Sequence, residues 1–118
     1  SGAAQGSCAK DVKTGPEWAD PMPPAFRLYP GATLVEAGGI DREQCTLRIL
    51  SFTTTTGVDP IIDFYYTQAK RAGYDAEHLL SQGEHQLGGT RKDGAAYVVF
   101  ARAAAGKPTE VNIVANAN

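Results

Sequence analysis

The chain of 118 residues has little of what several functional classes require. Its two cysteines are far apart, and no CxxC pair marks a zinc site. No apolar run approaches the ~20 residues that are needed to cross a bilayer. A net charge of −2 gives no bulk attraction for nucleic acid or anionic membranes. We therefore expect no transmembrane segment and no binding of nucleic acid.

The motifs of common enzyme classes are also missing. The sequence has no GxSxG, no HExxH and no GxxxxGK[ST]. The pair Gly88-Gly89 lies between predicted strands rather than before a helix, so we interpret it as a β-bulge or a close backbone contact. We expect a protein that is not an enzyme and that needs no cofactor.

What is present is the composition of one folded domain. Hydrophobic residues make up 42% of the chain and charged residues 20%, which is ordinary for a globular protein. A chain of this length can bury roughly two-thirds of its unfolded surface, so it can form a core without metal or cofactor. We therefore expect a single packed domain.

Residues 59–73 carry the signals of one helix, including both of its ends. Asp59 can cap the first turn, and Pro60 suits the first helical position. Gly73 provides the left-handed stop. One face is lined at helical spacing by Ile61, Tyr65, Ala69 and Ala72.

Most of the remaining chain has the pattern of β-strands. Asp93-Gly94 is a strong hairpin signal, Ser81-Gln82-Gly83 favours a short hairpin loop, and Gly38-Gly39 predicts a turn. The predicted strands cover residues 33–37, 44–55, 74–80, 84–91, 95–102 and 109–115. The expected fold is therefore α+β, a mostly antiparallel sheet in the order ββαββββ with the helix packed on one face.

The first 25 residues are rich in proline, which excludes a long helix or a central strand there. We expect residues 1–25 to form an extended arm laid over the α+β domain of residues 26–118. Trp18, the single tryptophan, either anchors this arm to the domain or is an exposed binding residue. We favour the anchor.

Cys8 and Cys45 allow two interpretations, a disulfide in an exported protein or two unrelated thiols. We favour the disulfide, because it would tether the polar N-terminal segment and contribute roughly 4 kcal/mol in the chain-entropy model. Disulfides persist in oxidising compartments, which indicates the periplasm or cell envelope. The chain starts at Ser1 rather than Met, as after removal of a signal peptide, and a lipid-modified cysteine upstream of Ser1 stays open.

The only titratable cluster is His78 and His85 with Glu77 and Glu84. Across a hairpin closed by residues 81–83, the two imidazoles would lie diagonally near each other and could hold a divalent metal or respond to pH. The alternative is a solvated hairpin face. We favour the solvated face, because no third ligand is evident.

The chain resembles small exported bacterial domains, many of them lipoproteins or periplasmic proteins of uncharacterised function. The resemblance covers about residues 26–115. It is carried by the turn Tyr29-Pro30-Gly31-Ala32, the helix pair Phe64-Tyr65 and the exit Ala72-Gly73-Tyr74, where tryptophan is more usual than Tyr74. These motifs are structural, so the resemblance implies a cell-envelope location and no catalytic residues.

We therefore expect a non-enzymatic cell-envelope domain that binds a protein or another envelope component. The expected surface is the exposed sheet face or the groove beside Trp18. One alternative is a small-ligand binder with a pocket between helix and sheet. The other is a metal-dependent hydrolase built on His78 and His85. The residues expected at the pocket mouth or partner surface are Tyr65, Tyr66, Tyr74 and Tyr97.

Overall fold

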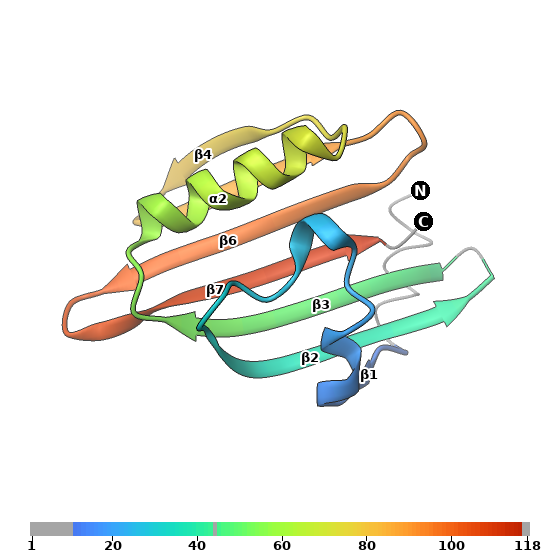
Figure 1. Cartoon of the computed structure of the whole chain (residues 1–118), viewed down its shortest axis with the longest axis horizontal. Coiled ribbons are helices and arrows are strands. Elements are labelled where there is room, and N and C mark those ends of the chain that lie inside the picture. Colours follow the sequence, from blue (N-terminus) through green and yellow to red (C-terminus); the bar gives the residue numbers. More distant parts are fainter. Residues whose placement is uncertain (1–10, 44, 117–118) are drawn as a thin grey trace.

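The computed structural model describes residues 11–43 and 45–116. Within these ranges the chain forms one sheet, one α-helix and two short 3₁₀ helices (Figure 1). The elements are β1 (Lys13–Thr14), η1 (Pro16–Ala19), η2 (Pro24–Phe26), β2 (Thr33–Arg42), β3 (Cys45–Thr54), α2 (Val58–Arg71), β4 (Glu77–Ser81), β5 (Glu84–Thr90), β6 (Ala96–Ala104) and β7 (Lys107–Asn116).

The seven strands form an antiparallel sheet in the order β1-β2-β3-β7-β6-β5-β4. The predicted α+β class is confirmed, and β2 to β7 with α2 follow the predicted order ββαββββ. The additional strand β1 pairs with β2 at one edge of the sheet. The other edge is β4. In the middle of the sheet β3 pairs with β7, which joins the strands before α2 to the strands after it.

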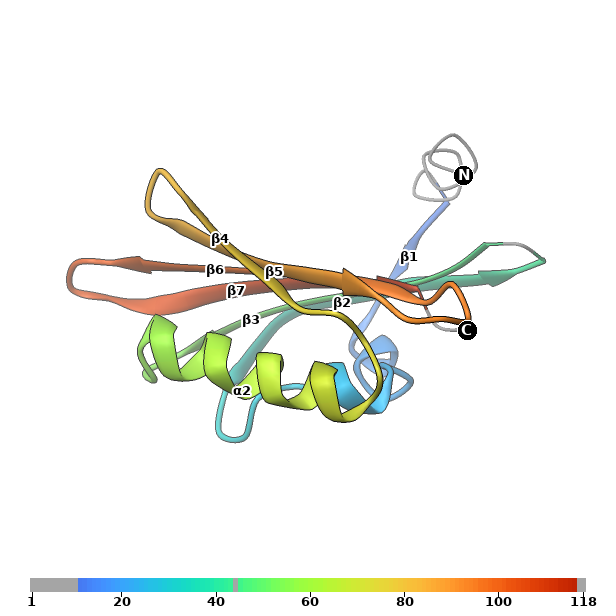
Figure 2. The ribbon, with the colours of Figure 1, turned by 90° about the horizontal axis from the view of Figure 1, so that it is seen from above.

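The helix α2 covers one face of the sheet, and no helix lies on the other face of the described structure (Figure 2). The core lies between α2 and the sheet. A row of directly paired side chains on five neighbouring strands, each at most 1% exposed, forms the floor of this core: Leu87, Val99, Ile113, Leu50 and Ala37. Successive side chains of a strand alternate between faces, so this row places every second residue of each strand on the covered side.

The two ends of α2 differ in how well the sequence predicts them. The prediction that Asp59 caps the helix is wrong: α2 begins at Val58, Gly57 occupies the N-cap position, and no side chain caps it. At the other end, Gly73 has a φ of 92°, and the N–H of Tyr74 donates to the carbonyl of Ala69 at 3.0 Å. This is the Schellman stop expected of a glycine at this position.

Residues 11–25 are not a uniformly extended arm, because Pro16 and Pro24 each begin a short 3₁₀ helix and part of the segment is buried against the core. Phe26 has no exposed surface and stacks on Tyr97 with ring centroids 4.4 Å apart. Met22 and Ala25 are buried in the same cluster. Proline excludes a long helix but not a 3₁₀ turn, because its fixed φ suits the first position of such a turn.

Gly38-Gly39 is not a turn, because β2 continues through both residues to Arg42. A Cβ at Gly38 would lie 2.9 Å from the carbonyl oxygen of Lys13 in β1. A Cβ at Gly39 would lie 2.5 Å from the Trp18 ring. The two glycines therefore let the N-terminal segment cross the strand at close range, a use of glycine that sequence does not distinguish from a turn.

Candidate functional site

The four tyrosines expected at a pocket mouth do not share a surface. Tyr65, Tyr74 and Tyr97 are at most 5% exposed, and only Tyr66, which is 43% exposed, reaches solvent. The rings of Tyr74 and Tyr97 pack edge to face at 5.2 Å, and Phe26 fills the space beside them. These aromatic side chains occupy the space between helix and sheet where the pocket was expected.

Two of these tyrosines use their hydroxyl groups for structure. Tyr65 donates to the carbonyl of Arg27 at 2.7 Å, and Tyr97 donates to the carbonyl of Asp75 at 2.8 Å. Burial, with a smaller contribution from Asp75, raises the pKa of Tyr97 to about 12. Burial also raises the pKa of Tyr65 well above its usual value. Both phenols therefore stay protonated and hold loop backbone against the core.

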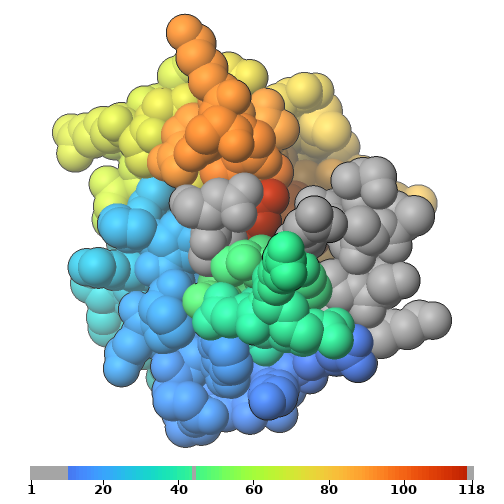
Figure 3. Space-filling view, turned by 90° about the vertical axis from the view of Figure 1, so that its right-hand side faces the viewer, coloured from blue at the N-terminus to red at the C-terminus, as the bar shows by residue number. Residues whose placement is uncertain are grey.

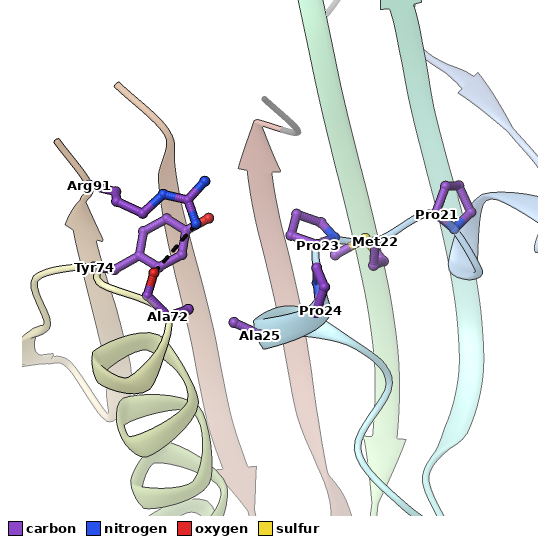
Figure 4. A pocket seen from close by; sticks show the side chains of 8 residues that line it. All are labelled: Pro21, Met22, Pro23, Pro24, Ala25, Ala72, Tyr74 and Arg91. Atoms are coloured by element: carbon purple, nitrogen blue, oxygen red, sulfur yellow. Dashed lines mark hydrogen bonds between the residues drawn. The ribbon is translucent and has the colours of Figure 1, made fainter. Parts of the chain in front are cut away.

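A groove of about 380 Å³ lies at the C-terminal end of α2. Figure 4 shows its two walls: Ala72, Tyr74 and Arg91 on one side, and the N-terminal segment on the other. The N-terminal wall consists of Pro21, Met22, Pro23, Pro24 and Ala25. In Figure 3 this N-terminal segment (blue) borders the turn after β5 (orange) and the end of α2 (yellow-green). The groove is thus apolar, with one cation at its rim.

That cation, Arg91, is held by three contacts. Its guanidinium lies over the Tyr74 ring at 4.7 Å, donates to the carbonyl of Ala72 at 3.4 Å and pairs with Asp93 at 2.8 Å. Hydrogen bonding between the two side chains raises the pKa of Arg91 and lowers that of Asp93. A ligand carboxylate at this rim would compete with Asp93 for the guanidinium.

Trp18 is half-buried in η1 and contacts the sheet. Its ring lies against Gly39, and the guanidinium of Arg48 lies 5.0 Å from its centroid. Arg48 also donates to the carbonyl of Pro21 at 3.3 Å and pairs with Asp41 at 2.9 Å. These contacts favour the role of an anchor for the N-terminal segment. A surface hollow of about 430 Å³, lined by Asp11, Lys13, Trp18, Ile40, Asp41 and Arg42, lies beside it.

The sheet face opposite α2 carries an apolar stripe across its three central strands. Ile49, Val114 and Val98 are direct neighbours on β3, β7 and β6. Leu47 and Phe100, two residues further along their strands, extend the stripe at either end. All five side chains are half-buried, and neither α2 nor a 3₁₀ helix covers them (Figure 2).

Polar side chains border this apolar stripe on the same face. Ser51 donates to Asn112 at 2.6 Å in the next row of the sheet. One row further, Arg102 lies 3.8 Å from Glu84 and opposite Glu110. The arrangement of an apolar centre within a polar border is typical of protein interfaces.

The two histidines meet as expected for a hairpin. Nε2 of His78 and Nδ1 of His85 lie 2.8 Å apart, which is the distance of an N–H···N hydrogen bond. Glu77 and Glu84 lie on the opposite face, because neighbouring residues of a strand alternate. Among residues 11–43 and 45–116, no group of three or more His, Cys, Asp and Glu residues lies close enough to hold a metal ion. The pair thus offers two ligands.

Cys45 begins β3 and is half-buried. Cys8 lies outside the described residues, so the disulfide remains a prediction. No helix in the described part of the chain is both long and apolar enough to cross a bilayer.

Comparison of the chain with protein-family models, with curated proteins and with solved structures gives no match.

None of the candidate residues predicted from the sequence lies in the apolar stripe. A signal for it was available in β6, where Val98 and Phe100 alternate with Tyr97 and Val99, so that the strand is apolar on both faces. This pattern is typical of a central strand, and β6 does lie between β5 and β7. Because no described helix covers the second apolar face of β6, the same pattern also marks a candidate binding surface.

Proposed function

We propose that this protein is a non-enzymatic domain of the cell envelope that binds an envelope protein through the apolar stripe. The observation that carries the proposal is the stripe itself: five half-buried apolar side chains on three neighbouring strands, which no helix of the described residues covers. An antiparallel sheet with one wet face ordinarily alternates apolar and polar residues. Here both faces are apolar at the centre.

The shape of this face supports a protein partner rather than a small molecule. Small ligands are bound in concave sites that enclose most of their surface. The stripe lies on a sheet, where side chains of adjacent strands form a broad surface with a polar border. A partner of similar breadth can cover the stripe and contact the border.

Two features of the sequence support the proposed location in the cell envelope. The predicted pairing of Cys8 with Cys45 requires an oxidising compartment. The resemblance of residues 26–115 to exported bacterial domains implies the same location. Both arguments are independent of the stripe, so the location and the binding surface can be tested separately.

The test is site-specific photo-crosslinking in the cells that produce the protein. A photoreactive residue at Val98 should crosslink to one partner, whereas the same residue at the exposed Tyr66 on α2 should not. The variant V114K, which places a charge at the centre of the stripe, should abolish the crosslink from position 98 while circular dichroism stays unchanged. Equal crosslinking from both positions, or a crosslink that survives V114K, would contradict the proposal.

A second candidate function is the binding of a small apolar anion in the groove of Figure 4. Its volume of about 380 Å³ lies within the range of ligand sites, and Arg91 supplies a cation at the rim. The probe 8-anilinonaphthalene-1-sulfonate should bind more weakly to R91Q and more tightly to D93N, because Asp93 competes with the anion for Arg91. Equal affinity of both variants and the unmodified protein would remove this candidate.

A further inference from the structure

The edge strand β4 lacks the lysine, proline and bulge that often prevent an edge strand from pairing with another chain. All five of its residues are exposed, and Leu79 and Leu80 are 52% and 65% exposed. The strand contains no lysine and no proline. Exposed edge strands are normally short, charged or bent, because their free backbone groups accept further strands.

The opposite edge of the same sheet is protected in these ways. Strand β1 has only two residues, one of them Lys13, and the chain leaves the sheet into η1 directly afterwards. Strand β2 also contains a register shift between Leu34 and Glu36. Such irregularities turn an edge away from incoming strands. The contrast points to β4 as the edge that is available to a partner.

The β4–β5 hairpin determines which backbone groups of β4 are free. Ser81 pairs with Glu84 across the two-residue loop Gln82-Gly83, whose φ angles of 52° and 80° are those of a type I′ turn. The residues that flank such a loop form a hydrogen-bonded pair, and bonded and non-bonded pairs then alternate along the ladder. The N–H and C=O groups of His78 and Leu80 therefore point away from β5, toward solvent.

We propose that β4 pairs antiparallel with β4 of a second copy of this chain, on a two-fold axis at Leu79. In this register the outward backbone groups of His78 face those of the partner subunit's Leu80, and the symmetry repeats this pair. Each pair exchanges two N–H···O=C hydrogen bonds. Leu79 then lies directly opposite the partner subunit's Leu79 in a non-hydrogen-bonded position.

Charge and strand length select this register. Glu77 faces the partner subunit's Ser81, so no like charges lie opposite each other. A two-fold axis at His78 would place two titratable imidazoles face to face. An axis at Leu80 would pair His78 with Gln82, whose φ of 52° is incompatible with an extended strand. Only the axis at Leu79 uses all five residues of β4 in both copies.

The edge is sterically accessible in the structure. Figure 2 shows the β4–β5 hairpin turning away from the side of the sheet that α2 covers. Pairing would join the two sheets into one continuous sheet. It would leave the apolar stripe on β3, β6 and β7 uncovered, so this dimer and the proposed function are independent of each other.

The test is the mass of the full chain in solution, measured by sedimentation equilibrium from about 1 μM to about 100 μM. We expect a monomer–dimer equilibrium. The variant L79K should weaken dimerisation at least about tenfold, because it places two like charges on the axis. The variant L80P should do the same by removing an outward N–H that the monomer does not use. The control V35K places a lysine at an exposed apolar residue far from β4, where Val35 is 65% exposed against 52% for Leu79, and should leave dimerisation unchanged.

Disulfide trapping tests the register itself. Non-hydrogen-bonded antiparallel partners have Cα atoms about 4.5 Å apart, within the range of a disulfide. L79C should therefore form a crosslinked dimer under mild oxidation, and V35C should not. A monomer at the highest concentration, a dimer that persists in folded L79K, or equal crosslinking of L79C and V35C would each overturn the proposal.

Discussion

On one side of the sheet, Leu87, Val99 and Ile113 have no exposed surface, because α2 and the N-terminal segment lie over them. On the other side, Ile49, Val98 and Val114 are equally apolar but only half-buried. The two faces thus differ in what covers them far more than in the residues that they present at their centre. Apolar alternation along a strand therefore identifies a core only when a covering element is also identified.

The largest expected difference between the two faces comes from neighbouring residues of β7. Ile113 lies on the covered face without exposure, and Val114 lies on the uncovered face. I113A should lower the free energy of unfolding by about 2–5 kcal/mol, because it leaves a cavity. V114A should cost about 1 kcal/mol or less, because its side chain is already partly hydrated. Urea denaturation of both variants measures this difference, and equal losses would mean that both faces are covered in solution.

The adjacent glycines of β5 provide a second matched pair. A Cβ at Gly89, on the covered face, would overlap the carbonyl oxygen of Asp75, which also accepts the hydrogen bond from Tyr97. At Gly88, on the uncovered face, the nearest atom would be the carbonyl oxygen of Tyr97 at 3.3 Å. We expect G89A to cost about 3 kcal/mol and G88A about 1 kcal/mol. Melting temperatures test the order, and a more damaging G88A would reverse the assignment of the faces.

A smaller effect is expected at the end of the covering helix. Gly73 has a φ of 92°, which a β-branched residue adopts only with strain, although space beside it is free up to Arg91 at 3.5 Å. We expect G73V to cost about 2 kcal/mol and G73N clearly less, since asparagine tolerates this conformation better. An unchanged melting temperature of G73V would show that Gly73 does not terminate α2 in solution.

The smallest expected effect is a loss of stability at alkaline pH, which comes from Tyr97 on the covered face. The folded-state pKa of Tyr97 is raised from 10.0 to about 12, mainly by burial. Its contribution to stability is therefore complete below about pH 10 and is lost as the pH rises toward 12. Thermal melts across this range should show a steeper loss for the unmodified protein than for Y97F. Identical slopes would place the phenol in solvent.

Local signals in the sequence predict most of the fold. Asp93-Gly94 predicts a hairpin, and the N–H of Gly94 donates to the carbonyl of Arg91 at 3.0 Å, which closes the turn. Gly73 likewise predicts the end of α2. Both signals succeed because the backbone conformation of these glycines is decided by neighbours within a few residues.

The parts that sequence misses depend on contacts between distant segments. Gly39 has the same local pattern whether it turns or accommodates Trp18, and only the folded N-terminal segment decides between them. The same segment brings Phe26 onto Tyr97 and so removes that tyrosine from the surface. Three of the four predicted tyrosines, Tyr65, Tyr74 and Tyr97, therefore belong to the core and not to a binding surface.

Trp18 is the single tryptophan, and its ring contacts Gly39 of β2 and the guanidinium of Arg48 of β3. Its fluorescence therefore reports on one event, the docking of the N-terminal segment on β2 and β3. Far-ultraviolet circular dichroism reports on the sheet and helix as a whole. Whenever the two signals change at different denaturant concentrations, the protein contains two cooperative units, and its own indole distinguishes them without any added label.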